Sequence, residues 1–347
     1  MAFSLTIAVA LALTAGSNPA SDEALDAYEA GLRTPAHLQP MSYGGGVEWI
    51  FQAEPAGDDG PRCRIYVREY GAEGAEPWIV VHGGFGAEHS YLLDAFAGLE
   101  REVRLIFYDQ RGSLRSHCPT EYVTSDAHVL DIERLRRVMG LERINLVGHS
   151  MGTHLTGRYL ERFGQSVDRI VLLAPAHLRY PLEEADLAAN PAAGDNNAAG
   201  GQMMNRDVVT AQIEAEGFGE EEELGLRERD FAWRIRFTGV NSYSVSHWRE
   251  LRGGGAFYSG EAGQAAWQSR PETVDLVPVL KAHPGPVSVI IGDHDFADPG
   301  AGLNRHWFGD DPDVSLTVLE NAGHNAWLDQ PRAFRRALVE AMGLGGD

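Results

Sequence analysis

The octapeptide Asn145-Leu-Val-Gly-His-Ser-Met-Gly152 decides the fold, because an apolar run enters a Gly-x-Ser-x-Gly sequence that continues as a helical pattern. Glycine is needed on both sides of the serine, since the turn strains the serine backbone and brings neighbouring chain too close for side chains. A strand, a tight turn and a helix in this order are typical of a nucleophile elbow. Ser150 is therefore the candidate nucleophile.

A serine nucleophile also needs a base, an acid that orients the base, and donors for the oxyanion. The apolar run Trp78–Val81 predicts a buried strand that leads into His82-Gly-Gly-Phe-Gly86. A glycine-rich loop of this kind offers a backbone N–H to a developing oxyanion. We therefore expect Gly84 to be one donor and the N–H of Met151 to be the second.

Candidates for the acid and the base follow later in the chain. The apolar strand Val287–Ile291 ends in Gly-Asp-His-Asp295, and the strand Val314–Leu319 ends in Asn-Ala-Gly-His324. We expect Asp295 to orient His324, which acts as the base. The order Ser, Asp, His is the order found in α/β-hydrolases.

The loop after the strand at 287 leaves the acid open. Asp298 is the main alternative to Asp295 and Asp293 is the next, because the fold of the loop decides which carboxylate faces the imidazole. His82 and His149 flank the predicted catalytic site. Each belongs to a motif, HGGFG or GHSMG, which already accounts for its presence there. We expect these two histidines to shape the loops rather than to transfer protons.

A set of five motifs is shared with one known family: HGGFG at 82–86, DQRG at 109–112, GHSMG at 148–152, GDHD at 292–295 and AGH at 322–324. Together they resemble the proline iminopeptidase family of α/β-hydrolases, which also includes tripeptidyl aminopeptidases. The resemblance covers roughly residues 45–175 and 285–345. Two positions depart from the family pattern: Phe85 replaces a proline and offers an added N–H, and Leu114 replaces a glycine. The second departure makes peptidase specificity less firmly implied than the fold.

The resemblance implies an α/β fold of the α/β-hydrolase type, with a mostly parallel central sheet flanked by helices. The segment between its two halves has helix-forming composition and no alternating run, which predicts an inserted, mainly helical cap at 176–284 and a core at 18–175 and 285–347. We expect helices at 208–216, 220–237 and 263–268 and a mobile loop at 190–201, which is poor in large apolar residues. Cap tryptophans at 233, 248 and 267 are expected mostly to form the core of the cap.

The implied activity is that of a serine hydrolase, most of all an aminopeptidase that releases N-terminal residues from short peptides. The alternative is a carboxylesterase or lactonase that uses the same residues on a small acyl substrate, since both reactions share a tetrahedral intermediate. A third interpretation, a non-catalytic binding protein with this fold, is disfavoured by the intact serine, aspartate and histidine. An aminopeptidase must bind a free ammonium, and acidic cap residues are available at 214, 216, 220–223, 228 and 230.

Composition limits the partners. The formal net charge of -21 argues against nucleic acid and anionic membranes. No metal site is expected, because HExxH is absent and the chain has only 2 cysteines, and no organic cofactor is needed. The oligomeric state is not predicted.

The N-terminus predicts export. Phe3–Leu13 is an apolar run of signal-peptide length, and Ala15-Gly-Ser17 offers small residues for cleavage, so residues 1–17 are the predicted signal peptide. No Lys or Arg precedes the run, and the alternative is a buried N-terminal helix in a cytoplasmic protein. A periplasmic or secreted chain could join Cys63 to Cys118 in a disulfide, and the run is too short for a lasting membrane anchor.

Overall fold

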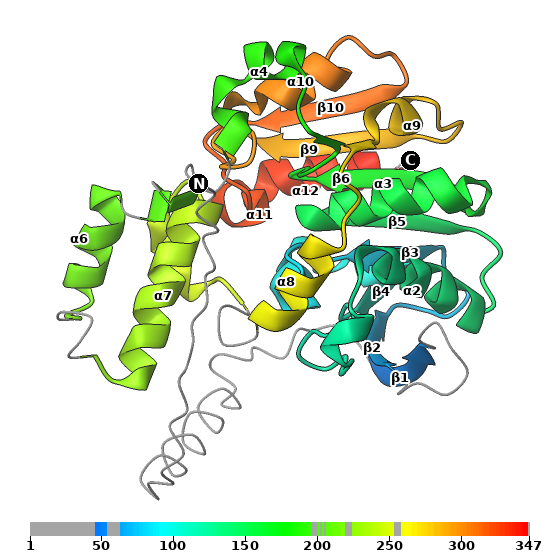
Figure 1. Cartoon of the computed structure of the whole chain (residues 1–347), viewed down its shortest axis with the longest axis horizontal. Helices are drawn as coiled ribbons and strands as arrows, with labels where there is room; N and C mark the ends of the chain where they lie inside the picture. Colours follow the sequence, from blue (N-terminus) through cyan, green and yellow to red (C-terminus); the bar gives the residue numbers. More distant parts are fainter. Residues whose placement is uncertain are drawn as a thin grey trace, which may run out of the picture.

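The computed structural model describes residues 46–53, 63–195, 200–201, 203–204, 206–218, 224–252 and 258–345. The predicted signal peptide lies outside these ranges. Within them an 8-stranded sheet has the order β1-β2-β4-β3-β5-β6-β9-β10 (Figure 1). The strands are β1 (Val47–Ala53), β2 (Cys63–Tyr70), β3 (Pro77–Val81), β4 (Arg104–Tyr108), β5 (Ile144–His149), β6 (Val167–Leu173), β9 (Val287–Gly292) and β10 (Val314–Leu319).

The sheet is mostly parallel, which confirms the predicted fold class. Among these described strands, only β2 runs antiparallel to its two neighbours, β1 and β4. The other neighbouring pairs are parallel, from β4 and β3 through to β9 and β10. Parallel strands covered on both faces are continuously apolar, which is why β5 and β9 are buried at every residue.

Side chains alternate between two hydrophobic clusters, one on each face of the sheet. In β3, Ile79 and Val81 join one cluster, whereas Trp78 and Val80 join the other. The first cluster is covered by α2 (Ser125–Val138), α3 (Met151–Phe163), α9 (Val277–Lys281) and α10 (Gly302–Phe308). The second is covered by the 3-10 helix η1 (His89–Phe96), α11 (Ala326–Asp329) and α12 (Pro331–Ala341).

An insertion of residues 176–284 separates β6 from its sheet neighbour β9. Its elements within the described residues include β7 (Arg179–Tyr180), α4 (Glu184–Ala189), η5 (Pro191–Asp195), α6 (Asp207–Ala215), α7 (Leu226–Asn241), η7 (Val245–Arg249), α8 (Gly260–Gln268), β8 (Val274–Asp275) and α9. Figure 1 shows α6 and α7 beside the body of the molecule, on the side toward which β9 and β10 point. The division into core and cap stays a prediction.

The expected cap helices at 208–216 and 263–268 correspond to α6 and α8, and the one at 220–237 corresponds to α7, although 219–223 lie outside the described residues. The expected loop at 190–201 begins with the short helix η5, and 196–199 again lie outside the described ranges. One feature was not anticipated: β7 pairs with β8 in a small antiparallel sheet. Strands of two residues are too short to show an alternating pattern in the sequence.

The aromatic residues of the insertion differ in their surroundings. Trp248 packs on Phe231 at 5.6 Å between ring centroids, and Trp233 stacks on Phe237 at 4.7 Å. Trp267 is instead 40% exposed and lies against the guanidinium of Arg270. Its ring also meets His177 edge-on at 4.8 Å between centroids, so all three tryptophans have aromatic-ring neighbours within the insertion, and Trp267 is the exposed one.

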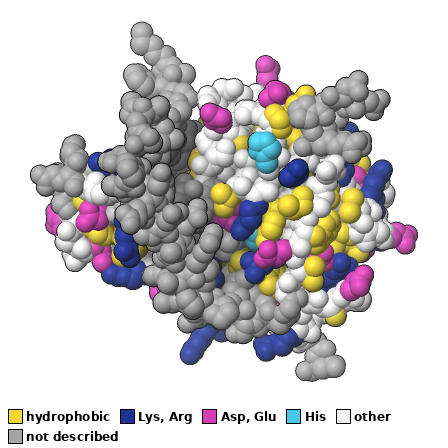
Figure 2. Space-filling model, turned by 90° about the horizontal axis from the view of Figure 1, so that it is seen from below, with side chains coloured by type: hydrophobic (Ala, Val, Ile, Leu, Met, Phe, Trp, Pro, Cys, Tyr) yellow, Lys and Arg dark blue, Asp and Glu magenta, His cyan; other side chains and the backbone are white. Residues whose placement is uncertain are grey.

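Cys63 and Cys118 form a disulfide with 4.4 Å between their Cα atoms. The bond ties the start of β2 to the segment that follows the DQRG motif. Among the described residues, no helix combines the length and the apolarity that a bilayer crossing requires. Among the described side chains on the face shown in Figure 2, basic and acidic groups are interspersed.

Candidate active site

The site lies where several parallel strands end. Ser150 follows β5, His82-Gly-Gly-Phe-Gly86 follows β3, and His324 comes five residues after Leu319, the last residue of β10. Because these strands are parallel, their carboxyl ends meet at one edge of the sheet, where ligands of open α/β sheets bind. The topology thus gathers residues that are far apart in sequence.

Ser150 has the strained backbone that a nucleophile elbow requires, with φ 54° and ψ -127° at the start of α3. The flanking glycines are required by close contacts. A Cβ at Gly148 would lie 2.6 Å from Thr156 Oγ1, and one at Gly152 would lie 2.2 Å from the Val81 carbonyl oxygen. The Ser150 N–H donates to the Leu173 carbonyl at 2.9 Å, which fixes the turn against β6.

His324 and Asp295 form a buried pair. Nδ1 of His324 lies 2.9 Å from each carboxylate oxygen of Asp295, and the side chains are 3% and 0% exposed. The Ala297 N–H also donates to Asp295, at 2.8 Å. Because the carboxylate accepts, Nδ1 carries the proton and Nε2 keeps a free lone pair, as a general base needs. The imidazole contacts the rings of Phe296 and His149, whose centroids are 4.7 and 4.9 Å away.

The two alternative carboxylates have other partners. Asp298 accepts from the N–H groups of Leu303 and Asn304 at 2.8 and 3.0 Å and so anchors the start of α10. Asp293 lies 2.6 Å from His294 Nδ1 and accepts from the Ala322 N–H at 3.3 Å. The structure thus directs Asp295 toward His324. Asp298 faces the start of α10, and Asp293 faces His294 and the backbone of Ala322.

The glycine-rich loop lies against Ser150. A Cβ at Gly83 would be 2.6 Å from Ser150 Cβ, so this position admits no side chain. Gly84 follows with φ +66°, a conformation that favours glycine. Met151 is the first residue of α3, where a helix N–H has no acceptor within the helix. The two expected oxyanion donors therefore come from segments that meet at Ser150.

The DQRG motif is hydrogen-bonded to His82, the first residue of this loop. The Gln110 N–H donates to Nε2 of His82 at 3.0 Å, and the Gln110 side chain donates to the His82 carbonyl at 2.7 Å. Arg111 forms a bidentate pair with Asp131 of α2 at 2.7 and 2.6 Å. Burial lowers the pKa of His82 and keeps it neutral, as its role as an acceptor requires. The motif thus fastens the glycine loop to the sheet and to α2.

A buried cluster of charge lies beside this loop. Ligand atoms of Glu88, His89 and Asp109 lie within 4.8 Å of one another, close enough to suggest a cation site. The guanidinium of Arg115 binds both carboxylates at 2.9 Å, however, and so supplies the positive charge itself. Burial would raise the pKa of Asp109, but His89 and Arg115 outweigh it and hold the pKa far below its usual value. We assign no metal to this cluster.

Sequence reasoning missed Asp329, which connects the insertion to the histidine loop. Its carboxylate accepts from the N–H groups of Tyr243 (2.7 Å), Ser244 (3.1 Å) and Gly323 (2.9 Å). Gly323 packs so tightly that a Cβ there would lie 2.8 Å from Ser242 Cα. Asp329 ends a short apolar stretch with no recognised motif, so nothing in the sequence signalled this role.

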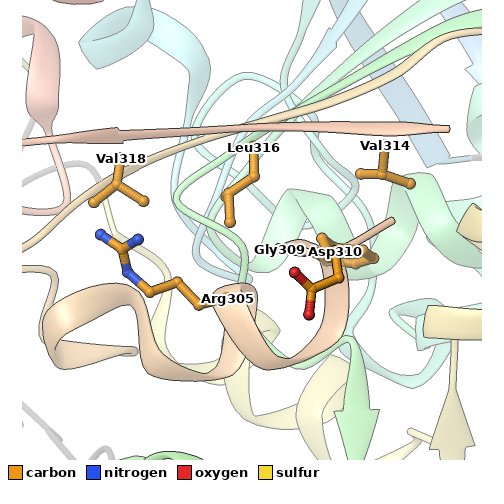
Figure 3. A pocket seen from close by; sticks show the side chains of 7 residues that line it. Arg305, Gly309, Asp310, Val314, Leu316 and Val318 are labelled. Carbon is orange, nitrogen blue, oxygen red and sulfur yellow. The ribbon is translucent and has the colours of Figure 1, made fainter. Parts of the chain in front are cut away.

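A pocket of about 540 Å³ lies elsewhere, at the outer edge of the sheet between α10 and β10 (Figure 3). Arg305 and Asp310 face Leu316 and Val318 across it. Its lining includes neither a serine nor a histidine. It is therefore separate from the site around Ser150.

Comparison with known proteins supports the fold and leaves the substrate open. The family model of the alpha/beta hydrolase fold matches residues 77–331. A proline iminopeptidase from Heyndrickxia coagulans is 32% identical over 119 residues, which cover 34% of this chain and only 41% of that protein. The (lyso)-N-acylphosphatidylethanolamine lipase from Mus musculus is 24% identical over 274 residues, which cover 76% of this chain and 78% of that one.

The solved structures agree in fold. A proline iminopeptidase-related protein from Thermus thermophilus has a TM-score of 0.58 at 24% identity, covering 86% of this chain and 98% of that chain. A thermophilic esterase from Thermogutta terrifontis has a TM-score of 0.57 at 19% identity, covering 85% and 98%. At these identities the likeness shows the fold alone. With its family match, strand order and elbow, the chain belongs to the alpha/beta hydrolase fold family.

Proposed function

We propose that the chain is a serine hydrolase with Ser150 as nucleophile, His324 as base and Asp295 as the residue that orients the base. The observation that carries this proposal is the buried His324–Asp295 pair, at 2.9 Å, at the same edge of the sheet as the strained Ser150. Gly84 and Met151 are the proposed oxyanion donors.

The reaction then follows from the chain's own groups. Ser150 Oγ attacks the substrate carbonyl while His324 Nε2 takes its proton, and Asp295 stabilises the imidazolium that forms. The N–H groups of Gly84 and Met151 bind the oxyanion. When the tetrahedral intermediate collapses, His324 returns the proton to the leaving group. Water hydrolyses the acyl-enzyme by the same steps.

The proposed activity is release of N-terminal residues from short peptides, as in proline iminopeptidases. It is supported by the motifs at 82–86, 109–112 and 148–152 and by the local identity with a proline iminopeptidase. Of the acidic cap residues, Glu216 is paired with Arg249 and Glu228 accepts the Gly225 N–H at 2.8 Å. These two are engaged within the insertion, so we look to other carboxylates for the substrate ammonium.

A second candidate activity is the hydrolysis of carboxylic esters or lactones. It is supported by the lipase relative, whose match extends over 76% of this chain and so reaches beyond the proposed core into the insertion. The same nucleophile and oxyanion donors serve an ester, because both reactions pass through a tetrahedral intermediate. The two activities differ in whether a free amine on the substrate is recognised.

A matched substrate panel separates them. Wild type and Ser150→Ala are tested on aminoacyl and tripeptide anilides with free and with blocked N-termini, beside short-chain nitrophenyl esters. Faster cleavage of free-amine anilides, lost in Ser150→Ala, supports the aminopeptidase. Ester turnover without anilide cleavage contradicts the aminopeptidase and supports the second candidate.

We also propose that the chain is exported to the periplasm or secreted. The disulfide between Cys63 and Cys118 supports this, because disulfides persist in oxidising compartments. N-terminal sequencing of protein purified from the producing cells tests it. A mature chain that begins near residue 18 is expected, and an uncleaved Met1 would contradict the proposal.

A further inference from the structure

Tyr91, on the 3-10 helix η1, is hydrogen-bonded to both sides of the elbow. Its hydroxyl oxygen lies 2.7 Å from the Gly83 N–H and 2.7 Å from Nδ1 of His149. Nε2 of the same histidine lies 3.3 Å from the carbonyl oxygen of His324. A single chain of contacts thus links the glycine loop, the residue before the nucleophile and the backbone of the proposed base.

The direction of each hydrogen bond follows from the groups. The Gly83 N–H can only donate, so the Tyr91 oxygen accepts from it. Nε2 of His149 faces a carbonyl, which can only accept, so Nε2 carries the proton. In the neutral ring Nδ1 is then the acceptor, so the Tyr91 hydroxyl donates to it.

Electrostatics supports this protonation state. Burial and the proximity of His324 lower the pKa of His149 well below its ordinary value, so the ring is neutral at pH 7. Burial raises the pKa of Tyr91, and the hydroxyl keeps its proton. Trp327 packs on both rings, with centroids 6.2 Å from Tyr91 and 5.2 Å from His149, and holds them in place.

We propose that Tyr91 and His149 are positioning residues that fix the oxyanion loop and the His324 loop to the nucleophile elbow. The inference rests on the proposed function and adds residues to it. A Cβ at Gly83 would lie 2.6 Å from Ser150 Cβ, 2.9 Å from the His149 carbonyl oxygen and 3.1 Å from the Tyr91 hydroxyl. The donor Gly84 is the next residue, so a shift at Gly83 moves it relative to the substrate.

The first test is Tyr91→Phe, which keeps the ring and removes only the hydroxyl. Loss of one direct oxyanion donor lowers kcat about 10²–10³-fold, and an indirect loss through Gly83 is expected to cost about 10–100-fold. KM for the best panel substrate stays unchanged, because ground-state contacts are not altered. The control is Tyr108→Phe, since Tyr108 is buried and its hydroxyl has no hydrogen-bond partner in the described chain.

His149 provides the second test. His149→Gln offers a carbonyl to Tyr91 and an N–H to the His324 carbonyl, whereas His149→Leu offers neither. We expect the Gln variant to keep about 10-fold more of kcat than the Leu variant, with both folded by circular dichroism. Rescue by a polar side chain of another shape distinguishes hydrogen bonding from packing.

The outcomes keep this inference apart from the proposed function. If wild type hydrolyses a substrate and Tyr91→Phe retains full kcat, the positioning role is wrong. It is also wrong if Tyr91→Phe raises KM and leaves kcat unchanged. Equal losses in Tyr91→Phe and Tyr108→Phe would also contradict it. If Ser150→Ala is as active as wild type, the proposed function itself fails, whatever the Tyr91 variants show.

Discussion

The surroundings of Ser150 and the helices α6 and α7 of the insertion differ in how they are held. Every residue of β5, which delivers Ser150, is buried, and the two clusters around the sheet include most of the buried apolar side chains of the described chain. The insertion has a separate cluster of four buried residues, Val209, Ile213, Ile235 and Trp248. The proposed site therefore rests on an extensively packed frame, the sheet and its two clusters, whereas α6 and α7 rest on a small cluster.

The difference in packing suggests that the frame positions reacting groups and that α6 and α7 accommodate conformational change. A densely packed frame holds reacting groups to within fractions of an ångström, which catalysis requires. A region with few buried contacts opens at low free-energy cost and accommodates change. Asp329 and Gly323 lie where the two regions meet, as does Asn325, whose N–H donates to the Asn241 carbonyl at 2.6 Å, so they are among the points at which the insertion can affect His324.

The largest expected effect tests the frame. Asp295→Asn is expected to lower kcat about 10⁴-fold, because the amide selects the wrong tautomer of His324. Asp298→Asn is the control: it weakens the start of α10 at a cost of about 0.5–2 kcal/mol and leaves kcat within about 10-fold of wild type. Steady-state kinetics and urea unfolding measure both. A larger kcat loss in Asp298→Asn than in Asp295→Asn would show that Asp298, and not Asp295, orients His324.

The sequence predicted the frame well because its signals are local. GHSMG required two glycines for reasons that the structure shows, the contacts of Gly148 and Gly152. The strand at 314–319 has the bounds that the sequence predicted. Asp295 was preferred over Asp298, and the loop after β9 turns it toward His324.

The features that the sequence did not predict depend on contacts between distant segments, and such contacts leave no local pattern in a single sequence. Tyr91 is separated from His149 by 58 residues and Asp329 from Tyr243 by 86. Both residues lie in stretches without a motif. The β7–β8 pair likewise joins Arg179 to Asp275, 96 residues away, through strands too short to predict.

A second pair of variants compares the two regions directly. Leu155 of α3 and Ile235 of α7 are both fully buried. Leu155→Ala is expected to lower the global free energy of unfolding by about 2–5 kcal/mol. Ile235→Ala removes similar contacts, but its effect is confined to α6 and α7 and appears as faster hydrogen exchange there.

Hydrogen-exchange mass spectrometry with urea unfolding measures both variants. If Ile235→Ala accelerated exchange equally in β5 and β9, the insertion and the frame would unfold as one unit. That result would remove the distinction between the two regions.

At the junction, Asp329→Ala leaves three backbone N–H groups without their acceptor. A misplacement of about 1 Å costs up to 10²-fold in rate, so kcat/KM is expected to fall about 10–100-fold. Exchange at residues 242–244 should rise in parallel. Asp329→Glu, with the same charge and one more methylene, is the comparison, and it should recover part of the loss. An Asp329→Ala enzyme with wild-type kinetics would show that the junction does not position His324.

The smallest effect concerns acid stability. Burial lowers the pKa of His154 to about 4, against 6.5 in the unfolded chain. Between these values the unfolded chain binds more protons, so the free energy of unfolding falls as the pH falls from 6.5 to 4, by about 1.4 kcal/mol per pH unit for this group. His154→Asn keeps a donor for the His177 carbonyl and removes the titration.

Urea unfolding at pH 7, 5.5 and 4.5 measures this dependence. Other histidines whose pKa is lowered by desolvation, such as His177, contribute with the same sign, so His154→Asn should reduce the slope without abolishing it. An unchanged slope would mean that His154 is charged in the folded protein.

The central claim is that Ser150 is an activated nucleophile. The most direct measurement is covalent labelling with a fluorophosphonate, followed by peptide mass spectrometry to locate the modified residue. We expect one label on Ser150, loss of activity in proportion to labelling, and greatly slowed labelling in His324→Ala. A hydrolytically active protein that carries no label, or that is labelled and inactivated at another residue, would contradict the claim.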